Sequence, residues 1–445
     1  MQTSRSILIR PDAITTKAMA IVLALVLFGF ATPSQAASNQ DELDFIAAQI
    51  QRAEADQASA LLRQMIEQIE RSQGRYAEDL VQPLTLLGDA QSALNQLKAA
   101  ADSYDRALHL NRINSGLFDP GQTTIVYRQA RIAMNQGDLM GARQREEYAF
   151  EVQQRHYGSG STELLPALAR LGQFYQRGYN FLAARTLFKR ALVILESNDA
   201  GDSQAAVPFL QGIAESYLTE GFPPFRYTPS QYDPRMQSGM REQDLFREVG
   251  SVNNFPAGER ALQQVVKIQQ AALDSAQLLS ETTDEELAQL SHALHLSLLK
   301  LADWHQMFGH IREAKTLYTH LYDQTHQDPE RPTMIFAEPK LLYMPKPKDP
   351  KIPRGYARDS ASGTVEVQFD VLPNGRIRDL QTVQSDPNGL MDFQVRRNLR
   401  DAIFRPAVGI DGPVISKAYV HKHDFEYYPE GELDAVASST IEQPE

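Results

Sequence analysis

The side chains that could do chemistry in this sequence are few and scattered. His292 and His295 stand three residues apart, which would place both on one face of a helix, and His421 and His423 would share one face of a strand. A zinc site needs a third ligand and ordered supporting groups, and neither pair has an obvious partner nearby. We therefore expect no metal and no cofactor.

Enzyme motifs are absent from the chain. It has no Gly-x-Ser-x-Gly, His-Glu-x-x-His, Walker or Gly-x-Gly-x-x-Gly pattern. The 445 residues include no cysteine, which excludes disulfides, thiolate metal sites, thiol catalysis and a lipid-modified N-terminal cysteine. The acidic run at Asp284, Glu285 and Glu286 is better explained as favourable charge at the N-terminus of a helix. We expect a protein that is not an enzyme and has no catalytic residues.

The overall charge also narrows the class of partner. The formal net charge is −12, which argues against nucleic acid because phosphate binding needs a basic face. The hydrophobic content of 42% is ordinary and excludes wholesale disorder. A chain of this length should fold as two or more domains.

Residues 1–36 have the features of a signal peptide. Arg5, Arg10 and Lys17 precede an apolar run of about 14 residues over 18–31, and small residues follow at Ser34 and Ala36. A membrane-spanning helix needs about 20 apolar residues. The sequence predicts cleavage before Ala37 and export to the periplasm; the alternative is an uncleaved anchor in the inner membrane, facing the periplasm.

A repeat of 42 residues dominates the next 300 positions. Small residues recur at this interval and larger apolar residues follow one helical turn later, as expected where two helices approach closely. The recurring alanines are Ala58, Ala100, Ala142 and Ala184. The clearest unit reads Leu171-Gly172-x-x-Tyr175, then Ala184, Phe188 and Ala191.

This pattern resembles the tetratricopeptide repeat (TPR), in the long-helix form of kinesin light chains. The resemblance implies an α-helical solenoid, a TPR-like α/α superhelix, over residues 37–330. The first helix of each pair would line a concave groove that holds an extended peptide or another protein. Candidate groove residues are Tyr127, Arg131, Met134, Gln173, Gln176 and Glu215.

The period breaks at an insertion over residues 222–258. It carries Phe222, Phe225, Tyr227 and Tyr232 among prolines. Two interpretations stay open: a lid or partner-binding arm over the groove, or a surface excursion that only covers the repeat. The single tryptophan, Trp304, belongs to a repeat helix and is expected in the core.

Residues 331–358 differ in composition from the rest of the chain. Six prolines alternate with lysines and arginines, and seven basic against two acidic residues give this segment a charge of +5. It favours an extended polyproline II spacer, or a strap against the acidic repeat. Residues 430–445 are predicted to be an acidic, disordered tail.

Residues 359–429 predict a small α+β domain. Val365, Val367, Phe369 and Val371 alternate with polar residues and predict a half-buried strand. A turn at residues 373–375 leads to a return strand over 376–384. Apolar residues at helical spacing run from Met391 to Phe404, and a last strand covers about 414–428. The order is ββαβ.

These residues are similar to the TonB C-terminal domain. The similarity rests on Gly363-x-Val365-x-Val367-x-Phe369-x-Val371-x-x-Asn374-Gly375-Arg376, on Phe404-Arg405-Pro406-Ala407 and on Asp411-Gly412-Pro413-Val414. It implies that the last strand pairs with a short segment of an outer-membrane receptor, the TonB box, by β-augmentation. The residues that this would involve are Lys417, Tyr419, Val420, His421, His423, Phe425 and Tyr427.

Two functions follow from these resemblances. The first is a periplasmic adaptor of a Gram-negative bacterium that binds one partner in its repeat groove and another on its TonB-like domain, in TonB-dependent transport. The second is an inner-membrane energy transducer that couples an ExbB/ExbD-like complex to outer-membrane receptors. The C-terminal domain is also a candidate surface for a homodimer.

Overall fold

The computed structural model describes residues 33–223, 255–279, 282–326, 336–350 and 360–428. Residues 1–32 of the predicted signal peptide, the acidic tail and most of the predicted insertion therefore lie outside the described residues. No helix in the described ranges has the length and apolar character needed to cross a membrane. The chain divides into two compact units, Met1–His156 and Tyr157–Glu445, and each is described by itself.

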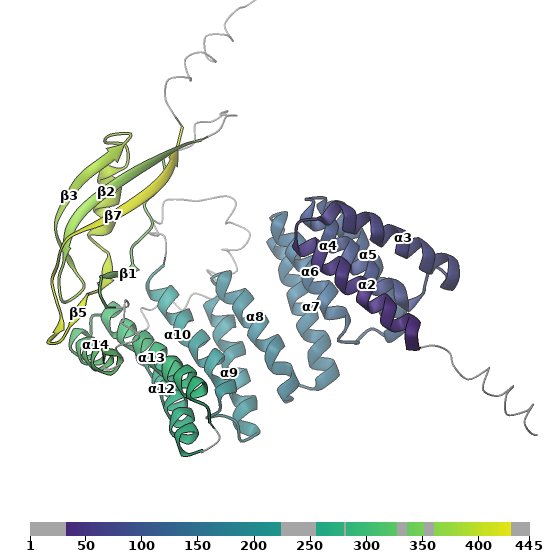
Figure 1. The fold of residues 1–445 in the computed structure, drawn as a ribbon, viewed down its shortest axis with the longest axis horizontal. Helices are drawn as coiled ribbons and strands as arrows, with labels where there is room; N and C mark the ends of the chain where they lie inside the picture. Colours follow the sequence, from purple (N-terminus) through teal and green to yellow (C-terminus); the bar gives the residue numbers. More distant parts are fainter. Residues whose placement is uncertain (1–32, 224–254, 280–281, 327–335, 351–359, 429–445) are drawn as a thin grey trace, which may run out of the picture. The chain divides into compact units, whose positions relative to one another are not determined.

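The first unit consists of three helical hairpins. Helices α2 to α6 each pack against the next along the chain (Figure 1). Helix α7 is joined to α6 by hydrogen bonds from Tyr148 to Gln122 and from Gln153 to Tyr127. The helices are α2 (Pro33–Gln51), α3 (Ala55–Gln73), α4 (Val81–Ala93), α5 (Leu97–Ser115), α6 (Gln122–Asn135) and α7 (Leu139–Tyr157), with a short 3-10 turn η1 at Glu78–Leu80.

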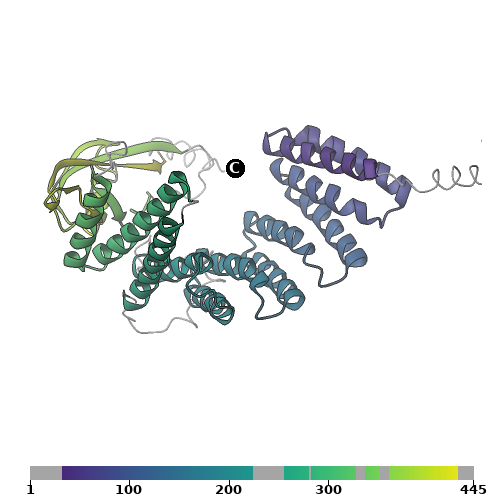
Figure 2. The same cartoon turned by 60° about the horizontal axis from the view of Figure 1, so that its bottom comes forward.

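The second unit continues the same hairpin pattern and ends in the sheet (Figure 2). Its helices are α8 (Leu165–Arg177), α9 (Phe181–Ser197), α10 (Val207–Gly221), α12 (Phe255–Leu278), α13 (Asp284–Met307) and α14 (Ile311–His326), with 3-10 turns η2 (Thr162–Leu164) and η3 (Gln204–Ala206). Helix α13 begins with a capping box between Thr283 and Glu286, which confirms the acidic run as a helix start.

The 42-residue spacing corresponds to a close contact between the two helices of a pair. Gly88 lies against the ring of Tyr104, and Gly172 lies against the ring of Phe188 so closely that a Cβ on either glycine would overlap the ring. Both rings are buried, and the four recurring alanines are fully buried. The prediction of a TPR-like α-helical array is confirmed.

Trp304 lies in the core, as the sequence predicted, and it also packs against a glycine of a neighbouring helix. It is 2% exposed and packs against Gly258 of α12, where no side chain would fit. Helix α12 also buries Ala261, Val265 and Ile268.

The C-terminal part of the chain forms a three-stranded antiparallel sheet and two small strand pairs. The sheet order is β3-β2-β7; β1 pairs with β4, and β5 pairs with β6. The strands are β1 (Lys340–Tyr343), β2 (Ala361–Val371), β3 (Ile377–Asp386), β4 (Ile403–Arg405), β5 (Val408–Gly409), β6 (Gly412–Pro413) and β7 (Ser416–Tyr427).

One face of the three-stranded sheet is packed against helix α15 (Asp392–Leu399). Alternate side chains of β2, from Val365 to Val371, are buried there together with Val395 and Leu399 of the helix. This is the predicted α+β arrangement of two strands, a helix and a last strand.

Two features of this region differ from the sequence-based prediction. The helix ends at Leu399, and Ile403 and Phe404 belong to strand β4. Residues 340–343, which lie inside the predicted spacer, form the strand β1 that pairs with β4. No local sequence pattern predicts either difference. β1 and β4 are short, and their pairing joins segments some sixty residues apart.

The described part of the predicted spacer is attached to the C-terminal fold. Met344 packs against the core of the sheet, Pro345 and Pro347 are buried, and the carbonyl of Pro345 accepts a hydrogen bond from Asn398 Nδ2 at 2.8 Å. Residues 340–347 are therefore held against the sheet domain and do not act as a free tether.

Candidate partner-binding site

Strand β7 forms one edge of the sheet. Among the described strands it pairs only with β2, so its other side carries backbone groups that no described strand satisfies. The pairing with β2 runs without a register shift from Ala361↔Tyr427 to Phe369↔Tyr419. An uninterrupted edge of this length is suitable for accepting another extended segment.

The inner face of β7 carries the aromatic and histidine side chains predicted for the site. Tyr419, His421, His423, Phe425 and Tyr427 alternate with exposed residues and are half-buried or buried. The ring of Phe425 covers Gly363 of β2, where a Cβ would lie 2.5 Å from the ring. The inner row therefore belongs to the core of the domain and stabilises β7 in place.

The outer face of β7 is polar and exposed. Val420 is 45% exposed, and Lys417 and Lys422 are exposed on the same face. The sequence thus placed Lys417 and Val420 in one site with the inner-face residues, whereas the structure separates the two sets onto opposite faces of one strand. A segment added at the edge would extend both faces.

A bulge near the start of β7 is fixed by a carboxylate. Ala418 has a φ of 54°, in the left-handed region, and its N–H donates to Asp370 Oδ1 at 3.1 Å. Arg378 Nη2 donates to Asp370 Oδ2 at 3.2 Å. The hydrogen bond from Ala418 is the largest cause that holds the pKa of Asp370 below its usual range, and the bond from Arg378 is the next largest.

The two histidines of β7 are in an environment that favours their neutral form. Burial lowers the pKa of His421 and the pKa of His423, and each also has an Nε2 atom that is buried without a hydrogen-bond partner. The carboxylates of Asp349 and Asp424 act against this effect at His423. His421 and His423 do not gather with a third ligand among the described side chains.

One group of side chains in the described ranges could share a cation, and the sequence reasoning did not identify it. The ligand atoms of His305, His310 and Glu313 all lie within 4.8 Å of one another at the turn between α13 and α14. His305 Nε2 lies 3.6 Å from Glu259, and burial lowers the pKa of His305. The sequence feature that could have identified this group is the His-x4-His-x2-Glu spacing across the end of α13. His292 and His295 are not part of this group.

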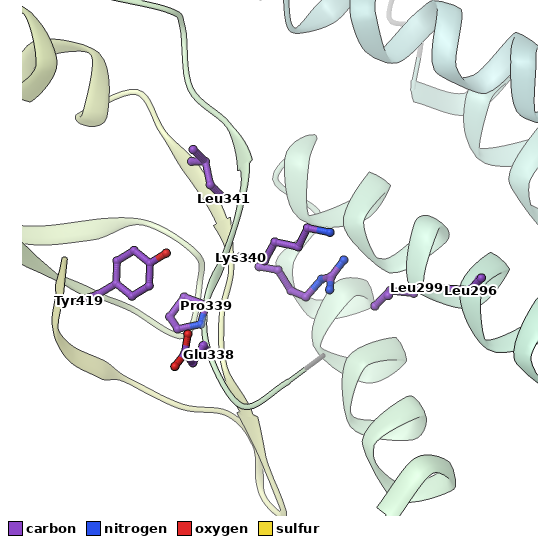
Figure 3. Close-up of a pocket in the computed structure, with 8 residues that line it drawn as sticks. Leu296, Leu299, Glu338, Pro339, Lys340, Leu341 and Tyr419 are labelled. Atoms are coloured by element: carbon purple, nitrogen blue, oxygen red, sulfur yellow. The ribbon is translucent and has the colours of Figure 1, made fainter. Parts of the chain in front are cut away.

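A cleft of about 540 Å³ lies where the sheet meets helix α13 (Figure 3). Tyr419 of β7 lies on one side of β1, and Leu296 and Leu299 of α13 lie on the other (Figure 3). The remaining lining residues are Glu338, Pro339, Lys340, Leu341 and Arg405. The cleft is therefore a mixed apolar and charged hollow at one end of β7.

Helices α13 and α14 contact the sheet domain through polar groups that the sequence did not reveal. Arg405 Nε donates to Asp303 Oδ1 at 2.8 Å and Arg405 Nη2 donates to Asp303 Oδ2 at 2.5 Å. Gln306 Nε2 donates to the carbonyls of Asn374 (2.7 Å) and Phe404 (3.1 Å). The arginine of the Phe-Arg-Pro motif thus binds a repeat helix.

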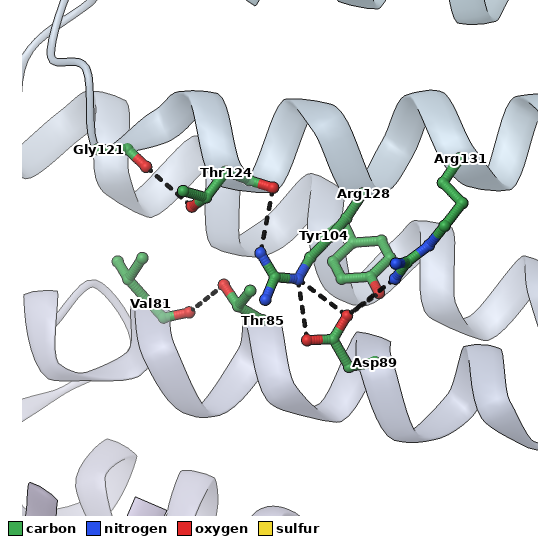
Figure 4. Close-up of polar contacts among 8 residues, drawn as sticks. All are labelled: Val81, Thr85, Asp89, Tyr104, Gly121, Thr124, Arg128 and Arg131. Carbon is green, nitrogen blue, oxygen red and sulfur yellow. Dashed lines mark hydrogen bonds and ion pairs between the residues drawn. The ribbon is translucent and has the colours of Figure 1, made fainter. Parts of the chain in front are cut away.

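The predicted groove residues lie on the first helices of three pairs. In the first unit, α6 carries Tyr127, Arg131 and Met134; Met134 is 44% exposed and Arg131 Nη2 lies 3.4 Å from Asp89 (Figure 4). The hydroxyl of Tyr127 accepts a hydrogen bond from Gln153 Nε2 at 3.0 Å. In the second unit, Gln173 and Gln176 lie on α8 and Glu215 lies on α10. Their role in binding stays a prediction.

Comparison with protein families gives an identity to the C-terminal part. Residues 348–421 match the family model described as Gram-negative bacterial TonB protein C-terminal. The match contains β2, β3, α15 and the first half of β7. It ends six residues before the end of β7 and begins after β1. No curated protein sequence matches the chain.

Solved structures were compared with the whole chain. The crystal structure of BtubC (BKLC) from P. vanneervenii is 14% identical, with a TM-score of 0.40, over 71% of this chain and 99% of that one. A structure of kinesin light chain nearly identical TPR-like repeats from Podosopora anserina is 15% identical, with a TM-score of 0.36, over 50% of this chain and 100% of that one. The observed helical hairpins show the stacked TPR-like repeats, and the family match gives the C-terminal part its TonB type over residues 348–421.

Proposed function

We propose that this protein is a non-enzymatic adaptor of the Gram-negative cell envelope that captures an extended peptide along β7. The observation that carries the proposal is the long edge of β7 in a domain of the TonB C-terminal type. Main-chain groups of the strand would supply affinity, and side chains on its two faces would supply specificity. The peptide would come from the periplasmic side of an outer-membrane receptor, in TonB-dependent transport.

The geometry favours β7 over β3, the other edge of the sheet. The pairing of β3 with β2 contains two register shifts, and Asp379 within β3 has a φ of 61°. Such bulges disrupt an edge and disfavour pairing with another strand. The register of β7 is continuous over the nine pairs from Tyr427 to Tyr419, so it offers a regular ladder to a partner.

The edge can be tested in cells by site-specific photo-crosslinking. A photoreactive residue at Val420 of β7, which is 45% exposed, should crosslink to an outer-membrane receptor, identified by mass spectrometry. The matched control is Val383 of β3, which is 51% exposed and should give no such product. Receptor crosslinks from Val383 and none from Val420 would refute β7 as the docking edge.

A proline substitution provides a second test of the same edge. Val420→Pro should abolish the receptor crosslink, here placed at Lys422, because proline removes a backbone donor and distorts the strand. The helical repeats should keep their circular dichroism signal. Val383→Pro is the control on β3. Retained capture by a folded Val420→Pro protein would contradict the proposal.

The helical repeats supply the second part of the proposal, a surface for another protein. Exposed groove positions such as Met134 on α6 and Gln173 on α8 are suitable crosslinking sites within their own units. A partner captured at either position but not at Val420 would show that the two surfaces bind different proteins. Capture of a second copy of the chain at Val420 would instead indicate the homodimer.

The alternative function is an inner-membrane energy transducer working with an ExbB/ExbD-like complex. It differs in requiring residues 18–31 to remain attached as an anchor. Mass spectrometry of the protein from cells decides between the two. A mature N-terminus at Ala37 in the periplasmic fraction excludes the anchored transducer, and an intact N-terminus in the inner membrane excludes the soluble adaptor.

A further inference from the structure

A contact of three residues joins neighbouring helix pairs in the first unit (Figure 4). Asp89 of α4 accepts a hydrogen bond from the hydroxyl of Tyr104 on α5 at 2.8 Å. Arg128 of α6, which belongs to the next pair, donates through Nε to both oxygens of Asp89, at 2.8 and 2.9 Å. A tyrosine and a carboxylate of one pair thus form an acceptor for an arginine of the next.

The same contact recurs at the end of the helical array, in the second unit. Asp303 of α13 accepts a hydrogen bond from the hydroxyl of Tyr318 on α14 at 2.8 Å, and the Asp-to-Tyr spacing is again 15 residues. The arginine is Arg405, whose Nε donates to Asp303 Oδ1 at 2.8 Å. It comes from strand β4 of the C-terminal domain and not from a helix.

Further contacts extend this junction along both helices of the last pair. Gln306 of α13 bridges the carbonyls of Asn374 and Phe404, and it lies against Gly375, whose φ of +72° and close surroundings leave no room for a side chain. On α14, Lys315 and Thr319 pack against Gly412. The C-terminal domain therefore lies over α13 and α14, where a following helix pair would stack.

The arginine of the second contact is more deeply buried than the arginine of the first. The side chain of Arg405 is 4% exposed, against 31% for Arg128, and both tyrosines are fully buried. A buried guanidinium that loses its carboxylate leaves an uncompensated charge in the interior, which is strongly unfavourable. Bidentate pairing also fixes orientation as well as distance. Arg405 therefore favours the arrangement in which the C-terminal domain is docked on α13, because there Asp303 pairs its charge.

We propose that the C-terminal domain takes the place of a further helix pair, latched to the last repeat by Arg405 through the same kind of acceptor that joins α4 and α5 to α6 in the first unit. The domain is then a fixed terminal cap of the solenoid and not a domain on a tether. Terminal repeats of such arrays need a cap over their exposed stacking face, and the sheet domain provides it. The inference does not depend on whether β7 binds a peptide.

Hydrogen exchange of the full chain, read by mass spectrometry, tests the latch from both sides. Asp303→Asn lies in the helices, yet it should speed exchange at least about tenfold in residues 403–413 of the domain. Arg405→Met lies in the domain, yet it should speed exchange similarly in α14. The diagnostic result is that each change acts across the junction; a local packing defect would act only on its own side.

The first unit supplies matched controls. Asp89→Asn and Arg128→Met change the equivalent contact and should speed exchange in α4 to α6 without affecting residues 403–413. If Arg405→Met fails to fold, Asp303→Asn and Tyr318→Phe still decide, since neither alters the sheet. Exchange in residues 403–413 that stays at the wild-type rate in Asp303→Asn overturns the proposal.

Discussion

At the residue scale, the glycine–aromatic contacts make a direct prediction about stability. Gly172→Ala should lower the free energy of unfolding by about 1–3 kcal/mol, because the added Cβ would overlap the ring of Phe188 in a packed core. Denaturant unfolding followed by circular dichroism measures the change. The same ring also lies against Gly212 of α10 and has little room to move aside.

A nearby glycine serves as the control for this prediction. Gly160 has no neighbour within 4 Å of the position that a Cβ would take, so Gly160→Ala should change stability by less than about 0.5 kcal/mol. Equal losses of stability from the two substitutions would mean that the contact of Gly172 with Phe188 does not matter.

The sequence predicted the contact of Gly172 with Phe188 because its spacing repeats every 42 residues. It could not predict the pair of Asp303 with Arg405, whose separation of 102 residues repeats nowhere.

At the scale of elements, β7 should give the domain a pH dependence. The pKa of His421 and the pKa of His423 are lowered by burial, so the folded state prefers both rings neutral. Their contribution to stability is fully present above the unfolded pKa of about 6.5 and is lost as the pH falls through the folded values. Unfolding followed by circular dichroism should therefore show lower stability at pH 5.5 than at pH 7.5.

Replacing the two histidines tests the assignment. The double variant His421→Leu/His423→Leu should show a smaller loss between pH 7.5 and 5.5 than the wild-type protein. Lys422→Leu, on the opposite face of the same strand, should keep the wild-type loss. If the double variant loses as much stability between pH 7.5 and 5.5 as the wild-type protein, the pH dependence comes from other groups. Candidates are His295 and His305, whose pKa values are also lowered by burial.

The strands differ in how clearly the sequence predicts them. β2 alternates buried with half-buried side chains, and β7 mostly alternates half-buried with exposed ones, so the period of two was visible in advance. β1 and β4 have four and three residues, too few for a pattern. The prolines after β1 suggested a spacer, but Pro345 and Pro347 are buried, because proline can pack against a sheet while lacking only the N–H donor.

At the scale of the whole molecule, the folded domain is larger than the family match. The match covers 348–421, whereas β1 and the last part of β7 lie outside it. Composition placed the domain boundary near residue 359, since the charge and proline content change there. Long-range contacts place it earlier: Leu341 and Met344 pack against the core of the sheet.

Two fragments that differ only in this segment test where the domain begins. Residues 336–428 should be more stable to denaturant than residues 360–428 by roughly 2 kcal/mol or more. The shorter fragment loses the pairing of β1 with β4 and leaves the amide of Asn398 buried without the carbonyl of Pro345. Both fragments lack α13 and Asp303, so the docking contact cancels from the comparison. Equal midpoints and slopes would show that residues 336–350 only lie against the domain, whereas a less stable shorter fragment would make this segment a structural part of the terminal cap.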